Sequence, residues 1–522
     1  MTDTPPLPSP PPGAAPSRGP RWWPAGALLV LGAVAIAVVQ SIPQRSQQHA
    51  NIQTAQAIAA TLAGLLLWLL FASRLSWRRR FAFLGGVLAL VGLMAGLFRV
   101  RGVTGNLVPI LELRWAARVI QPPAAGAAAG SLPALPGAAD FPQFLGPNRN
   151  GILAGPRLDA HWSSHAPALL WRQPVGAAWS GFVVAGGRAI TQEQRGEEEL
   201  TVCYALGSGK ALWSHAVKAR YFTPIAGEGP RATPMISGNR LLSLGATGIL
   251  SCLDLETGRE LWSRDILRLN NAGVPAWGLS GSPLLVGGNV VVNPGGDKGR
   301  ALVAYPLAGG EPAWSAGNEG DSYSSPLVAT LDGVPQILLF SGSLVGHDLQ
   351  TGAELWKFRW PGGHPHIAMP VVAGPTDVIL SSGYGTGSGR VRIRRDDSGK
   401  WSASEVWKGN RLKAKFTNPV PYGGNLYGLD DGILACLDAE TGGLRWKEGR
   451  YGHGQTLLVG SRLLLLAEDG SVVLVDPNPE GLRELARFPA LTGKTWNPPA
   501  LAGEYLVVRN DKEAACYRLP VE

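Results

Sequence analysis

Three uninterrupted apolar runs dominate the first hundred residues of the chain. They are PAGALLVLGAVAIAVVQSI (24–42), TAQAIAATLAGLLLWLLFAS (54–73) and FAFLGGVLALVGLMAGLF (81–98), and none of them contains a charged residue. At a rise of about 1.5 Å per residue, each run is long enough to cross roughly 30 Å of hydrocarbon. A cleaved signal peptide does not fit the first run, because no small-residue cleavage pattern follows it and a second apolar run does. The pattern therefore predicts three retained membrane spans.

Beyond residue 140 the pattern changes to short strand-like segments that recur. CLDLETGRELW (252–262) returns as CLDAETGGLRW (436–446), and related copies are CYALGSGKALW (203–213), AYPLAGGEPAW (304–314) and GHDLQTGAELW (346–356). Weaker copies end at Trp407 and Phe488. A period of about 40–50 residues built from short strands is typical of the blades of a β-propeller.

The two ends of the repeated region each carry half a unit. Trp171 ends a copy that has no strand pattern before it, and Cys516 begins a copy that has no ending. Pairing residues 498–519 with the strand around Trp171 would close the ring and leave no sheet edge exposed. The sequence thus predicts an all-β, eight-bladed propeller of four-stranded antiparallel blades, preceded by three transmembrane helices.

The residues that recur in each repeat are explained by the fold and need no ligand. In the turn of one unit, Asp254 and Thr257 are suited to bond nearby backbone amides, and Gly258 accepts a positive φ. The tryptophan that ends the unit is expected to pack between neighbouring blades. The four cysteines (Cys203, Cys252, Cys436 and Cys516) fall at one repeat position in four different blades. They are too far apart for disulfides, so we expect small buried residues.

Charge separates the two parts of the chain. The net charge is +9, and the only acidic residues before position 141 are Asp3, Glu112 and Asp140, so the excess of positive charge belongs to the N-terminal part. The propeller region is close to neutral and has no clustered basic face, which argues against nucleic acid as a partner. Four arginines follow the second apolar run (74, 78, 79 and 80), whereas the loop 43–53 has only Arg45. The positive-inside rule then places the propeller outside the cytoplasm, on a multi-pass protein of the cytoplasmic (inner) membrane.

These observations divide the chain into four parts. We expect a disordered, Pro-rich cytoplasmic tail over 1–21, a three-helix membrane anchor over 22–101 and an Ala/Gly/Pro-rich linker over 102–140. The propeller is expected over 141–522.

The repeated D-x-x-T-G-x-x-x-W pattern resembles the PQQ-like β-propellers over about residues 171–519. That family includes the quinoprotein alcohol and glucose dehydrogenases and the propeller lipoprotein of the outer-membrane assembly machinery. FPQFLGPNRNGI (141–152), GPRATP (229–234) and SYSSP (322–326) are similar to bacterial PQQ-binding-like β-propeller repeat proteins. The repeat specifies a fold that hosts several activities, so it does not by itself specify a function.

The quinoprotein branch of the resemblance implies PQQ held with Ca²⁺. In many of those enzymes an adjacent Cys-Cys disulfide covers the quinone, a Trp forms the floor, and Glu, Asn and Asp side chains hold the calcium. No two cysteines are adjacent in this chain. The membrane-bound glucose dehydrogenases lack that disulfide too and also carry N-terminal spans, so its absence does not decide between the branches. Their blades, however, have long insertions that build the cofactor pocket, whereas the eight blades of this chain share 171–519. No residue can be matched to the calcium ligands, so no metal site is assigned.

A binding site is instead expected at one mouth of the central channel, where loops lead into each inner strand. The residues just before these strands are mostly aromatic or cationic: Trp179, Arg231, Trp277, Tyr323, His366, Lys415, Asn418, His453 and Trp496. Such residues suit protein interfaces, stacking and cation–π contacts, and they are equally suited to brace the channel. Arg231, placed before a strand in EGPRATP, is the strongest single candidate.

The sequence favours a non-catalytic binding or scaffold module that recruits a protein or polymer partner through this mouth. The alternative is a membrane-bound PQQ-dependent dehydrogenase that oxidises alcohols or sugars. Neither the partner nor the process served follows from the residues.

Overall fold

The computed structural model describes residues 19–42, 47–116, 132, 135–362 and 365–522. The chain divides into two compact units, one made of 1–100 and 106–116 and the other of 101–105 and 117–522. The tail expected over 1–21 lies mostly outside the described residues, as does most of the linker expected over 102–140.

The first unit contains three helices that are long and apolar enough to span a membrane. They are α1 (Trp23–Ser41), α2 (Gln47–Leu67) continued by a π-helical turn η1 (Trp68–Ala72), and α3 (Trp77–Leu97). Most of their large apolar side chains are exposed, as expected for helices whose solvent is lipid rather than a protein core. The three runs predicted from the sequence therefore form helices of spanning length.

The structure differs from the expected linker at both ends. Strands β1 (Phe98–Val103) and β2 (Pro109–Leu113) form a two-stranded sheet where the linker was expected to begin. Near residue 140, the carbonyl of Pro136 accepts a hydrogen bond from the Tyr505 hydroxyl at 2.9 Å. The propeller is thus in contact with the chain before residue 141.

The second unit is a propeller of eight four-stranded antiparallel blades. In blade order, from the inner strand outward, the strands are β5 (Val183–Ala185), β6 (Arg188–Arg195), β7 (Glu198–Ala205), β8 (Ala211–Val217); β11 (Met235–Ser237), β12 (Arg240–Leu244), β13 (Ile249–Asp254), β14 (Glu260–Asp265); β15 (Leu284–Val286), β16 (Asn289–Val292), β17 (Leu302–Pro306), β18 (Trp314–Ala316); β19 (Leu327–Leu331), β20 (Val334–Phe340), β21 (Ser343–Asp348), β22 (Glu354–Arg359); β23 (Val371–Val372), β24 (Asp377–Ser382), β25 (Gly387–Arg395), β26 (Trp401–Gly409); β27 (Val420–Tyr422), β28 (Asn425–Asp430), β29 (Ile433–Asp438), β30 (Leu444–Arg450); β31 (Gln455–Val459), β32 (Arg462–Leu466), β33 (Ser471–Asp476), β34 (Arg483–Pro489); and β35 (Ala500–Ala502), β36 (Tyr505–Arg509), β37 (Glu513–Arg518) with β4 (Ala168–Pro174).

The remaining elements are short. They are β3 (Ile152–Leu153), which adds to β31, the small sheet of β9 (Phe222–Thr223) and β10 (Gly227–Glu228), and the helix α4 (Ile266–Leu269).

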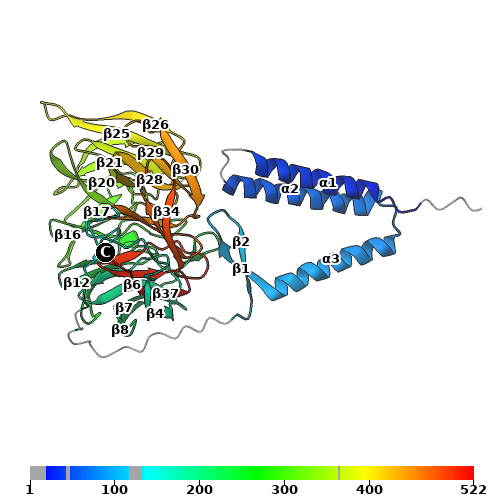
Figure 1. The fold of residues 1–522 in the computed structure, drawn as a ribbon, viewed down its shortest axis with the longest axis horizontal. Coiled ribbons are helices and arrows are strands. Elements are labelled where there is room, and N and C mark those ends of the chain that lie inside the picture. The colour runs from blue at the N-terminus through cyan, green and yellow to red at the C-terminus, as the bar shows by residue number, and fades with distance from the viewer. Residues whose placement is uncertain (1–18, 43–46, 117–131, 133–134, 363–364) are drawn as a thin grey trace, which may run out of the picture. The chain divides into compact units, whose positions relative to one another are not determined.

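The ring closes as the half-units predicted. β4 pairs with β37, and Trp171 lies opposite Cys516 in that ladder. In Figure 1 the red strand β37 lies beside β4, so the two ends of the propeller sequence share one blade. This closure pairs the outermost strand of the last blade and leaves no open seam in the ring.

The repeated turn forms the hydrogen bonds that its spacing predicts, and it also contacts the tryptophan of the preceding blade. Oδ1 of Asp254 accepts hydrogen bonds from the backbone N–H of Thr257 at 3.0 Å and from its hydroxyl at 2.8 Å. Trp213 of the preceding blade packs on Gly258 and donates its indole N–H to the carbonyl of Leu255 at 3.1 Å. The turn of each such blade is therefore also the socket for its neighbour's tryptophan. All four cysteines are fully buried beneath these turns, as expected.

Candidate functional site

The inner strands all start at one end of the channel, which we call the entry mouth; it comprises the loops before β5, β11, β15, β19, β23, β27, β31 and β35. Hydrogen bonds between equivalent positions join neighbouring loops there. Backbone N–H groups donate to the next blade's side chain in four cases: Gly181 to Thr233 (3.1 Å), Thr233 to Ser282 (2.9 Å), Ser282 to Ser325 (2.9 Å) and Met369 to Asn418 (2.8 Å). This circuit fixes the positions from which the mouth residues project.

The first group of mouth residues is built around Lys494. Its ammonium lies 4.5 Å from the ring centroid of Trp179 and 4.1 Å from that of Trp496, and the two indole rings are 4.9 Å apart. Phe416 extends the group, with its centroid 4.7 Å from that of Trp496 and 5.8 Å from that of His453. We call these five residues the lysine–tryptophan cluster.

Glu468, on the turn between β32 and β33, anchors this cluster. Its carboxylate accepts hydrogen bonds from the indole N–H of Trp496 at 3.0 Å and from the backbone N–H of His453 at 2.9 Å. Burial raises the pKa of Glu468, but hydrogen bonds from the backbone of Gly105 and His453 outweigh burial, and the pKa lies below its usual value. The carboxylate is therefore ionised at neutral pH and holds the aromatic rings in place.

The second group contains Trp277, Tyr323, Tyr384 and Lys415. The Trp277 ring lies 5.3 Å from that of Tyr323 and 6.1 Å from that of Tyr384, measured between centroids. The ammonium of Lys415 lies 5.4 Å from the Tyr384 ring and 3.8 Å from a carboxylate oxygen of Asp431. Burial lowers the pKa of Lys415, and burial together with this ammonium lowers the pKa of His453 to about 4. His453 is thus neutral at neutral pH.

Arg231 faces into the protein rather than out of the mouth. Its guanidinium donates to the carbonyls of Gly229, Ala226 and Gly227, the last two at 2.9 and 3.0 Å. It also lies 4.2 Å from the Tyr221 ring, and the whole residue is only 8% exposed. Burial lowers its pKa to about 10, while Tyr221 and Glu199 partly offset this. Arg231 therefore braces the 221–229 loop, on which the Trp179 indole N–H is held by the Ala226 carbonyl at 2.7 Å.

The predicted residues thus fall into three sets. Trp179, His453 and Trp496 belong to the lysine–tryptophan cluster, and Trp277, Tyr323 and Lys415 form the second group. Within these groups His453 and Lys415 are almost fully buried and support the aromatic rings from beneath. Arg231, His366 and Asn418 are internal braces: the His366 ring stacks on Phe340 at 4.6 Å, and Asn418 closes one step of the hydrogen-bond circuit.

Sequence reasoning missed Lys494, Phe416, Tyr384 and Glu468. Lys494 and Phe416 lie in the same loops as Trp496 and Lys415, so a wider window before each inner strand would have included them. Tyr384 and Glu468 lie on turns between the second and third strands of their blades. Those turns open at the same end of a blade as the loop into the inner strand, and this is the signal that would have identified them.

The opposite end of the channel, the exit mouth, is filled by the segment 141–153. Its residues pair with the edges of inner strands: Phe141 bridges Val184 of β5, and Ile152 and Leu153 pair with Leu458 and Val459 of β31. From this segment the fully buried guanidinium of Arg149 reaches into the channel and donates to the carbonyls of Ser282, Pro283 and Pro326.

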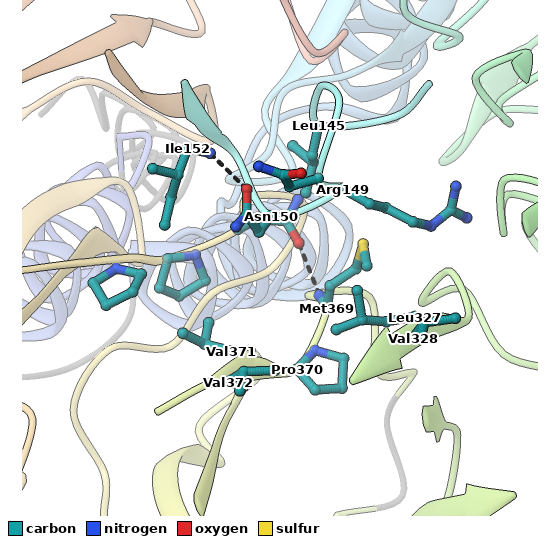
Figure 2. A pocket seen from close by; sticks show the side chains of 14 residues that line it. Leu145, Arg149, Asn150, Ile152, Leu327, Val328, Met369, Pro370, Val371 and Val372 are labelled. Carbon is teal, nitrogen blue, oxygen red and sulfur yellow. Dashed lines mark hydrogen bonds between the residues drawn. The ribbon is translucent and has the colours of Figure 1, made fainter. Parts of the chain in front are cut away.

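A hollow of about 140 Å³ remains beside this segment. Figure 2 shows Leu145, Asn150 and Ile152 on one side of it and Leu327, Met369 and Pro370 on the other. Its lining is largely aliphatic and carries no carboxylate. The hollow is a gap between segment 141–153 and the channel wall, and it contains no group suited to catalysis.

The entry mouth does not fit PQQ with calcium. The four cysteines lie fully buried in four blades, so no disulfide can cover a quinone ring. Over 19–42, 47–116, 132, 135–362 and 365–522, no group of three His, Cys, Asp or Glu side chains could hold a metal ion.

Comparison with known proteins identifies the repeat family. The sequence model described as outer membrane protein assembly factor BamB matches residues 164–265 and 197–448, which together span more than half of the chain. The chain belongs to this family. The matched residues lie within the propeller unit, and the three apolar helices precede them.

Two curated BamB-family relatives illustrate the extent of the similarity. The outer membrane protein assembly factor BamB of Shewanella oneidensis is 25% identical over 357 residues, covering 63% of this chain and 86% of that protein. Its counterpart in Burkholderia pseudomallei is 25% identical over 357 residues, covering 65% and 84%. The name of these relatives points to the cell envelope.

A solved structure gives the same fold. Quinohemoprotein alcohol dehydrogenase from Comamonas testosteroni superposes with a TM-score of 0.52 over 74% of this chain and 82% of that one, at 12% identity. At this identity the similarity shows the fold alone. The PQQ-like propeller expected from the repeat is thereby confirmed.

Proposed function

We propose that this protein is a non-catalytic scaffold of the cell envelope, anchored in the inner membrane by α1–α3, whose propeller recruits a protein partner at the entry mouth. The observation that carries the proposal is the asymmetry of the channel. One mouth is filled by segment 141–153, and the other carries two groups of aromatic and cationic side chains.

The residue types at the entry mouth support a protein partner. Aromatic anchors carry much of the binding energy at interfaces, and rings held by hydrogen bonds lose little conformational entropy on binding. Trp496 is held by Glu468, and the backbone N–H of Trp277 donates to the Tyr323 hydroxyl at 3.2 Å. The curated relatives are outer membrane protein assembly factors, which supports a partner from that process.

The test is capture of cross-linked partners from membranes that contain the full chain. Trp277→Ala removes a half-buried ring from the second group, and we expect at least about a tenfold loss of the captured partner with little change in melting temperature. Trp401→Ala, on the outer strand β26, is the matched control and should leave capture intact. If Trp277→Ala lowers the melting temperature and leaves capture unchanged, the aromatic residues only brace the channel and the proposal is wrong.

A further inference from the structure

Part of the chain's own sequence lies against the lysine–tryptophan cluster. Residues Arg101–Gly105, with the sequence RGVTG, belong to the same compact unit as the propeller. They touch the entry mouth on the side formed by the last blades. The family match does not include this segment, because it begins at residue 164.

The contacts are made mainly by the backbone of the segment. The N–H of Gly105 donates to Oε1 of Glu468 at 2.7 Å, and the carbonyl of Val103 accepts from the Lys494 ammonium at 3.0 Å. A carboxylate thus binds an N–H and an ammonium binds a carbonyl two residues away. Arg101–Val103 end strand β1 and Gly105 lies in the turn that follows, so the two charged groups bind backbone at the end of a strand and in its turn. Bonds with one charged partner are the stronger kind.

Two further contacts add selectivity. Arg101 forms an ion pair with Asp511, each side chain being 15% exposed. Gly105 lies directly against His453, and a Cβ at position 105 would come within 2.0 Å of Cδ2 of that ring. The site therefore takes a basic residue followed, four positions later, by glycine.

The groups that bind this segment are the ones that hold the aromatic rings. Glu468 also accepts from the Trp496 indole, and Lys494 also lies over the rings of Trp179 and Trp496. If the segment leaves, the half-buried Glu468 carboxylate and Lys494 ammonium each lose one hydrogen bond, and the loss of a hydrogen bond to a partly buried charged group is unfavourable. A replacement ligand must supply an N–H and a carbonyl in the same order, as a peptide backbone does.

We propose, building on the scaffold function above, that the entry mouth is a binding site for a basic, glycine-containing peptide in a strand-and-turn conformation, and that Arg101–Gly105 is its resident occupant. A partner segment of the same chemistry displaces the resident segment and makes the same backbone hydrogen bonds. Binding of the partner is therefore restrained by the chain's own sequence.

The test uses the full chain in detergent micelles and a fluorescent synthetic peptide of residues 99–107 (RVRGVTGNL). Gly105→Val places a side chain against His453 and expels the resident strand, so we expect the peptide to bind this variant about tenfold more tightly than the wild type. Adding Glu468→Gln to Gly105→Val, or replacing the glycine of the peptide that matches Gly105 by N-methylglycine, should each lower the affinity about tenfold.

Gly481→Val is the control, because nothing lies within 4 Å of a Cβ at that position. This variant should bind the fluorescent peptide with the same affinity as the wild type. Equal binding to Gly105→Val and to the wild type overturns the resident-occupant proposal. If the N-methylated peptide binds Gly105→Val as tightly as the unmodified peptide, the site does not recognise the backbone N–H, and that part of the proposal is wrong. If Trp277→Ala loses the partner while Gly105→Val binds no peptide, this inference fails and the scaffold function stands. If the peptide binds as expected while capture is insensitive to Trp277→Ala, the scaffold function fails.

Discussion

At the scale of single residues, the repeated turn of the propeller depends on a glycine for two separate reasons. Gly258 has a φ of +71°, and a Cβ there would lie 2.4 Å from Cε3 of Trp213 in the preceding blade. Gly238 has a φ of +54° but has nothing within 4 Å of its Cβ position. Substitutions at Gly238 and Gly258 therefore distinguish the free-energy cost of the left-handed backbone from the additional cost of displacing a tryptophan.

We expect Gly258→Ala to destabilise the propeller by about 3 kcal/mol and Gly238→Ala by about 1 kcal/mol, since both pay for the left-handed conformation and only the first displaces the ring. Chemical denaturation followed by tryptophan fluorescence measures both. Equal losses would show that Trp213 does not depend on this contact.

Glu199 gives the entry side of the propeller a pH dependence. Burial raises its pKa to about 7, although the Ala246 N–H and Arg231 lower it in part. Because the folded pKa lies above the unfolded value of 4.5, the folded state binds more protons between these values, and stability falls as pH rises through 7. We expect wild type to lose about 2–3 kcal/mol of unfolding free energy between pH 5 and 8, and Glu199→Gln to show a flatter profile. Parallel profiles for the two proteins would contradict this.

At the scale of elements, segment 141–153 acts as a plug because of Arg149. Removing its guanidinium leaves three channel carbonyls without this donor, so Arg149→Met should lower the unfolding free energy by about 3 kcal/mol. Arg157→Met is the control: that side chain is 85% exposed and should contribute little. Thermal melts of the two variants make the comparison. A loss below that of the control would mean that backbone pairing alone holds the plug.

The strands and the closure of the ring could be predicted, because the local sequence of a blade contains its turn residues and the tryptophan that ends it. The ladder of β4 with β37 follows from two half-units that need each other. Side-chain direction in loops could not be predicted in this way. Arg231 was expected to face a ligand, yet three carbonyls of its own loop turn it inward. Lys494 and Glu468 contact residues of other loops that lie near them only in the closed ring, so the sequence could not show their role.

The same limit applies to segments outside the repeat. FPQFLGPNRNGI was recognised as similar to other propeller proteins, but its place in the exit mouth depends on pairing with β31, about 300 residues later in the chain. Residues 101–105 carry no repeat pattern at all, and only the structure places Gly105 on Glu468. Contacts between a repeat and a non-repeating segment leave no periodic signal in a single sequence.

At the scale of the whole molecule, the arginines around the three apolar helices predict on which side of a membrane the propeller lies. Arg74 lies between the second and third helices, Arg78, Arg79 and Arg80 lie in the first turn of α3, and the positive-inside rule predicts that this end of α3 is cytoplasmic. With three helices, residues after α3 are then outside. A reporter enzyme that is active only outside the cytoplasm, fused after Glu522, is expected to be active.

The arginines themselves provide the control for this prediction. Replacing all four by Ala removes the bias. Since Arg99, Arg101, Arg114 and Arg118 favour the opposite orientation, reporter activity should then fall by more than half. Replacing Arg99 and Arg114 by Ala removes opposing charge and should leave activity unchanged or raised. A fusion after Glu522 that is active only with a cytoplasmic reporter would reverse the topology. It would also move the entry mouth to the cytoplasm, where it could not meet a partner outside the membrane.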